Sequence, residues 1–101
     1  MPSIIDKLND EQSGQVEQLA KALLSLEGVD QACAFLEDIA SVSEIKAMGQ
    51  RLEVARLLRE NMTYPQIVQM TGASTATISR VRKALDYGAG GYAAALDRIY
   101  K

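Results

Sequence analysis

The residues around Gly72 constrain the fold more than any other part of the sequence. Thr63-Tyr-Pro-Gln66 has the spacing of a capping box, in which a hydroxyl and a side chain three residues later satisfy each other's backbone amides, with proline in the tolerant first turn. This pattern predicts a short helix ending near Met70. Gly72 should break it, and Ser74 can cap a second helix that runs to about Leu85. Residues 63–85 are therefore predicted to form a helix-turn-helix.

The rest of the chain has apolar residues at the three- and four-residue steps of amphipathic helices. We expect these helices over about 10–27, 30–40, 42–60 and 92–100, with a flexible joint at 87–91. No strand alternation is found, so the sequence predicts one all-α domain over residues 1–101 with about six helices. Within it, Cys33 is expected to be a small buried core residue.

Composition excludes most catalytic chemistry. The chain has no histidine and one cysteine, which removes catalytic triads, Cys–His pairs, histidine metal clusters and internal disulfides. Glu37 and Asp38 are adjacent in a helix, so their carboxylates point in different directions. We therefore predict no enzyme and no bound metal. No signal sequence and no run of about 20 apolar residues is present, which predicts a cytoplasmic protein without a membrane partner.

Charge divides the chain into two parts. Residues 1–44 hold two basic and nine acidic residues, a formal charge of −7, whereas residues 45–101 hold nine basic and four acidic residues, a formal charge of +5. Such asymmetry suggests one part that faces a polyanion and another that is solvated or self-associating.

The second helix of the predicted helix-turn-helix divides into two faces. Ile78, Val81 and Leu85 fall on one side, where they can converge with Ile67 and Val68 of the preceding helix. The opposite side is small, hydroxylic and basic, as suits a helix that contacts base edges and phosphates in the major groove. The predicted DNA-contacting residues are Thr63, Tyr64, Ser74, Thr75, Ala76, Thr77, Ser79, Arg80, Arg82 and Lys83. Thr75 is expected at a base edge and Arg82 at a phosphate.

The run Thr71-Gly-Ala-Ser-Thr-Ala-Thr-Ile-Ser-Arg80 resembles the helix-turn-helix of the Trp repressor superfamily. The stretches 57–63 and 47–51 resemble the family's preceding helix and an earlier element, and Leu85-Asp-Tyr-Gly-Ala-Gly-Gly-Tyr92 is similar to the branch of the YerC/YecD type. The resemblance implies an all-helical, intertwined homodimer that binds double-stranded DNA and regulates transcription, as a repressor.

The same resemblance places a candidate effector pocket at Arg51, Arg80, Val81 and Ala84. In the tryptophan-binding repressor the indole lies between two arginines, which Arg51 and Arg80 match. The glycine that leaves room for the indole in that repressor is replaced by Val81 here. The serine that helps hold the ligand's amino group is replaced by Ala84. We therefore expect no tryptophan corepressor, while a different small effector stays open.

The acidic N-terminal helices carry more apolar surface than they can bury alone, which predicts a homodimer formed through residues 1–44. The repellent charge of those helices would also orient the basic face toward DNA. An alternative function is a protein-interaction module on a helix-turn-helix scaffold, because +5 is a modest charge for a DNA-facing half.

Overall fold

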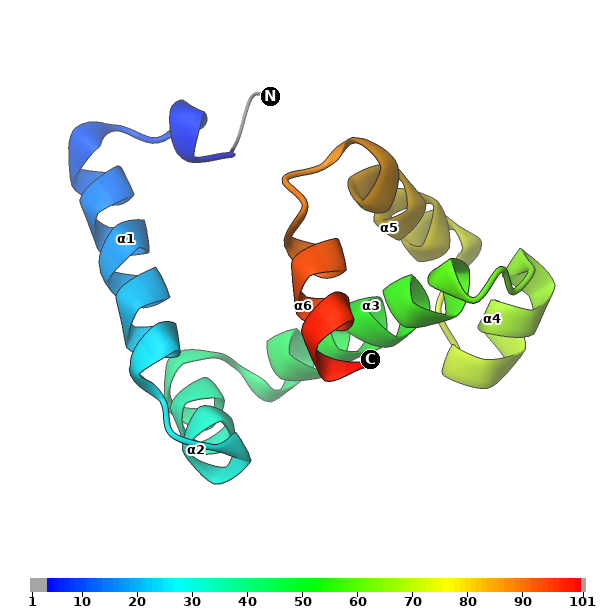
Figure 1. The fold of residues 1–101 in the computed structure, drawn as a ribbon, viewed down its shortest axis with the longest axis horizontal. Helices are drawn as coiled ribbons and strands as arrows, with labels where there is room; N and C mark the ends of the chain where they lie inside the picture. Colours follow the sequence, from blue (N-terminus) through cyan, green and yellow to red (C-terminus); the bar gives the residue numbers. More distant parts are fainter. Residues whose placement is uncertain (1–3, 101) are drawn as a thin grey trace. The chain divides into compact units, whose positions relative to one another are not determined.

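The computed structural model describes residues 4–100, in which helices are joined by short turns (Figure 1). A 3-10 turn, η1 (Ile4–Lys7), precedes six α-helices, and no β-strand occurs among the described residues. The helices are α1 (Asp10–Ser25), α2 (Val29–Ile39), α3 (Val42–Arg59), α4 (Tyr64–Thr71), α5 (Thr75–Tyr87) and α6 (Gly91–Ile99). The all-α class is confirmed.

The chain divides into two compact units, and the boundary along the sequence lies between Ile45 and Lys46. The first unit holds α1, α2 and the start of α3. The second holds the rest of α3 together with α4, α5 and α6. No helix within residues 4–100 is both long and apolar enough to cross a membrane.

Reciprocal side-chain caps explain where α1 and α3 begin. The Asn9 side chain accepts a hydrogen bond from the Gln12 amide at 2.8 Å, and the Gln12 side chain accepts from the Asn9 amide at 3.1 Å. Ser41 and Glu44 form the same reciprocal box before α3, with 3.2 Å and 2.7 Å between the paired atoms. The hydrogen bonds from Ser41 lower the pKa of the Glu44 carboxyl. These boxes satisfy amides that a helix start otherwise leaves without a partner.

The first unit buries no residue of α1 or α2 within this single chain. Large apolar side chains remain at the surface, including Leu23, Leu24, Val29 and Ile39. Cys33 is exposed as well, so its predicted place in a core is wrong for the isolated chain. The apolar pattern identified a face that favours burial, but in the single chain α1 and α2 bury none of their residues fully.

The second unit contains the core. Its fully buried residues come from α3, α4, α5, α6 and the turn before α5: Val54, Ala55, Leu57, Leu58, Ile67, Ala73, Ile78, Val81 and Leu96. Val68, expected beside Ile67 in this core, is instead 37% exposed. Adjacent helical residues point about 100° apart, so only one of the two can face the core squarely.

Helix α6 is fastened to α3 by a buried apolar residue and several surface contacts. Leu96 is buried, and Arg59 donates to the Asp97 carboxylate at 2.5 Å and to the Ala93 carbonyl at 3.3 Å. The Arg56 guanidinium lies 5.3 Å from the centre of the Tyr100 ring. Arg56 also donates to Glu53 at 2.5 Å, which lowers the pKa of that carboxyl. Arg56 and Arg59 are therefore already engaged by groups within the second unit.

Candidate nucleic-acid interface

Helix α4 is held at both ends by the residues that the sequence marked. The Thr63 hydroxyl accepts from the Gln66 amide at 3.3 Å, and the Gln66 side chain accepts from the Thr63 amide at 2.9 Å. At the other end Gly72 adopts a left-handed conformation, with φ of 73°, and its amide donates to the Val68 carbonyl at 2.9 Å. This conformation favours glycine, because a side chain there approaches the backbone too closely. The predicted capping box and glycine stop are both confirmed.

The turn between α4 and α5 is fixed by hydroxyl groups. The Thr71 hydroxyl donates to the Ile67 carbonyl at 2.7 Å and accepts from the Ala73 amide at 3.1 Å. The Ser74 hydroxyl accepts from the Thr77 amide at 3.1 Å and so caps α5 as expected. With Ala73 buried in the core, these bonds set the direction in which α5 leaves the turn.

Helix α5 has one buried and one exposed face, as predicted. Ile78 and Val81 are buried, and Leu85 packs against them at the edge of the core. Thr75, Ala76, Ser79, Arg80 and Lys83 are exposed. These five residues, called here the α5 outer face, form a surface of short hydroxyl and methyl groups that becomes basic toward the middle of the helix.

Two predicted contact residues take part in holding the motif together. Thr77 is half-buried, and its hydroxyl lies 3.1 Å from the Ser74 hydroxyl. Tyr64 is half-buried and packs against the core, so only part of its ring reaches the surface. Thr63 and Ser74 are exposed, but their hydroxyls serve as helix caps. The α5 outer face is therefore the part of the predicted site with the most accessible side chains.

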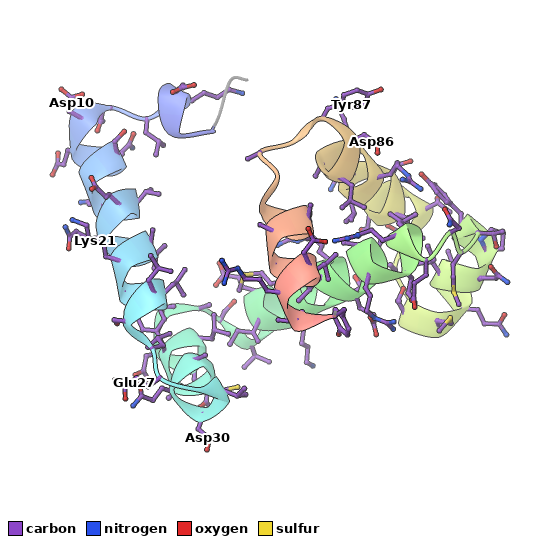
Figure 2. The ribbon with its side chains drawn as sticks, in the orientation of Figure 1. Asp10, Lys21, Glu27, Asp30, Asp86 and Tyr87 are labelled. Carbon is purple, nitrogen blue, oxygen red and sulfur yellow. The ribbon has the colours of Figure 1, made fainter. Side chains whose placement is uncertain are left out.

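Ion pairing separates the cations of this unit into two groups. Arg56 and Arg59 pair with carboxylates, and Arg82 lies 3.6 Å from Asp86 one turn further along α5. Figure 2 shows Asp86 at the C-terminal end of α5, beside Tyr87. Arg80, Lys83 and Arg51, by contrast, form no ion pair with any acidic side chain of residues 4–100. They present charge that can be neutralised by an external anion.

Arg51 and Arg80 line the same small hollow, between α3 and α5. Ala47, Gln50 and Thr77 complete its lining, and its volume is about 90 Å³. The other two members of the candidate effector pocket lie elsewhere: Val81 is buried in the core, and Ala84 lines a separate hollow with Gly90 and Tyr92. The structure thus brings the two arginines together without Val81 and Ala84.

Sequence reasoning gave no role to Gln50, which connects the elements behind this hollow. Its side-chain amide donates to the Thr71 carbonyl at 3.1 Å and so joins α3 to the end of α4. The helical spacing of Ala47, Gln50, Arg51 and Val54 could have placed all four on one side of α3, toward the helix-turn-helix.

Comparisons with known proteins agree with this geometry. The family model described as Trp repressor protein matches residues 14–100. The uncharacterized Bacillus subtilis protein YerC is 47% identical over 95 residues, which cover 94% of this chain and 88% of the relative. A crystal structure of a TrpR-like protein from Eubacterium eligens is 47% identical, with a TM-score of 0.83, and the match covers 93% of this chain and 94% of that one. A proposed Trp repressor from Staphylococcus aureus is 40% identical, with a TM-score of 0.85, over 94% of this chain and 92% of that one.

Proposed function

The chain belongs to the Trp repressor family, and we propose that it is a sequence-specific DNA-binding regulator of transcription that reads the major groove with α5. The α5 outer face carries this proposal. It combines exposed small side chains, which allow close approach to base edges, with two cations that have no acidic partner within residues 4–100. Repression follows most simply, because a protein bound at an operator blocks access to the DNA beneath it.

A second part of the proposal is that the protein acts as a homodimer. The first unit leaves the apolar side chains of α1 and α2 exposed in the single chain, whereas soluble proteins rarely expose a large contiguous apolar surface. Pairing of these helices with a second copy would cover them. Two copies of α5 spaced about 34 Å apart could then enter successive major grooves on one side of the duplex.

We also propose that tryptophan is not the effector. The hollow that contains Arg51 and Arg80 has a volume of about 90 Å³, well below the roughly 300 Å³ at the lower end of small-molecule sites. Val81 occupies core space where the tryptophan-binding relative has glycine. DNA binding should therefore be independent of tryptophan.

Titration of the protein with tryptophan in a calorimeter should accordingly give no saturable heat, with or without operator DNA. Micromolar saturable binding of tryptophan to the unaltered protein would contradict this part of the proposal.

Salt dependence tests the proposed function directly. Contacts to phosphates release counterions, so the logarithm of the DNA affinity should fall linearly as the logarithm of salt concentration rises. Lys83→Ala should reduce that slope by about 1, because Lys83 is exposed and has no ion pair within residues 4–100. Arg82→Ala should change the slope less, because Arg82 already lies near Asp86.

Fluorescence anisotropy of labelled duplexes over a range of salt concentrations measures these slopes. The alternative function, a protein-interaction module, predicts that the unaltered protein binds duplex DNA negligibly at every salt concentration. Equal slopes for the unaltered protein and Lys83→Ala would place Lys83 outside the interface.

A further inference from the structure

In the first turns of α5, the α5 outer face carries only short side chains as far as Arg80. Thr75, Ala76 and Ser79 are all exposed there, and together they present two methyl groups and two hydroxyl groups. Within residues 4–100, the hydroxyls of Thr75 and Ser79 make no side-chain hydrogen bond. Thr77, the other hydroxyl residue of these turns, is turned toward Ser74 instead.

The exposed methyl and hydroxyl groups limit which bases the N-terminal end of α5 can distinguish. Arginine or lysine recognises guanine through two hydrogen bonds, asparagine or glutamine recognises adenine, and a carboxylate accepts from cytosine. Thr75, Ala76 and Ser79 can make none of these paired contacts. A single hydroxyl can bond to any base and therefore discriminates weakly, whereas methyl groups pack specifically against the 5-methyl group of thymine.

The longer side chains of the same face are placed for another role. Arg80 lines the same hollow as Arg51 on α3, so two arginines border one small depression beside α5. Lys83 follows almost one turn later. Exposed cations of this kind suit contacts with the phosphate backbone. Such contacts fix the register of a helix in the groove without reading the base sequence.

We infer that Thr75 and Ala76 specify thymine in each half-site through its 5-methyl group, while Arg51, Arg80 and Lys83 hold the backbone. This inference rests on the proposed function and names the base that α5 recognises. Because Thr75 is the first residue of α5 and the N-terminal residues of a recognition helix reach deepest, its methyl group carries the main contact.

The test uses a site selected by the protein from randomised duplex DNA. Each thymine of one half-site is replaced in turn by uracil, which removes the methyl group and keeps the base pairing. Burial of one methyl-sized group is expected to change affinity about fourfold, so at least one replacement should weaken binding by about that factor.

Two variants at one position separate the methyl group from the hydroxyl. Thr75→Ser keeps the hydroxyl and should abolish the difference between thymine and uracil at the contacted position. Thr75→Val keeps a methyl group there and should retain it. The salt slope should be the same in both variants, since neither changes a charge.

The possible results distinguish failure of this inference from failure of the proposed function on which it rests. A selected site bound equally well in its thymine and uracil forms, or a uracil penalty unchanged in Thr75→Ser, overturns the inference and leaves DNA binding intact. Failure of the unaltered protein to select any site overturns both.

Discussion

Arg80→Ala should weaken binding to the selected DNA site by roughly tenfold to a hundredfold, the equivalent of about 1.4–2.7 kcal/mol, which is the range for a lost hydrogen bond between charged groups. Arg80 is exposed on α5, lies beside Arg51 and has no acidic partner among the described residues. No internal ion pair must therefore break before its guanidinium meets DNA. The loss should appear in both the affinity and the salt slope, because a charge is removed from the interface.

Arg98→Ala is the matched control for this variant. Arg98 is also an exposed arginine without an ion pair inside residues 4–100, but it lies on α6 and outside the helix-turn-helix. Both variants remove one positive charge, so a difference between them measures position rather than net charge. Equal losses for the two variants would mean that only the overall charge attracts DNA.

Leu23→Lys should weaken self-association by at least a hundredfold. Leu23 is 48% exposed in the single chain and lies one turn from Leu19 on the apolar side of α1. Burial of a leucine side chain contributes about 1.5–3 kcal/mol, and a two-fold interface contains each residue twice. The introduced ammonium groups would add the cost of burying charge.

Gln18→Lys introduces the same charge on a different side of α1 and should leave association nearly unchanged. Sedimentation at micromolar concentration should show a dimer for the unaltered protein and Gln18→Lys, and a monomer for Leu23→Lys. A monomer for the unaltered protein, or a dimer for all three, would contradict pairing through this face. Because α5 and its core lie in the second unit, Leu23→Lys should keep the helical content of that unit.

Capping residues and glycine predicted most of the helix boundaries. Thr63 with Gln66, Ser74, and Gly72 act within a few residues of themselves, so their effects can be read without knowing the rest of the fold. The alternation of buried Ile78 and Val81 with the exposed α5 outer face was likewise predictable, since helical geometry fixes which residues share a face. The short η1 turn was missed because four residues carry no periodic pattern.

Features that depend on distant packing could not be derived in this way. Cys33 belongs to an apolar stripe, but burial requires a partner surface that residues 4–45 do not supply. The Gln50 contact with Thr71 depends on how α3 crosses α4, and the pairing of Arg59 with Asp97 depends on how α6 folds back. A sequence pattern shows which face favours burial or charge pairing, whereas the partner is determined by the tertiary structure.

Selection from randomised duplex DNA tests the central claim most directly, with the unaltered protein and Arg80→Ala carried through in parallel. We expect the unaltered protein to enrich a two-fold symmetric site whose half-sites lie about 10 base pairs apart, the spacing of successive major grooves. Arg80→Ala should prefer the same site but enrich it less at the same protein concentration, because it binds DNA more weakly. If the unaltered protein leaves the pool random at low salt, α5 does not read DNA and the proposed function is wrong.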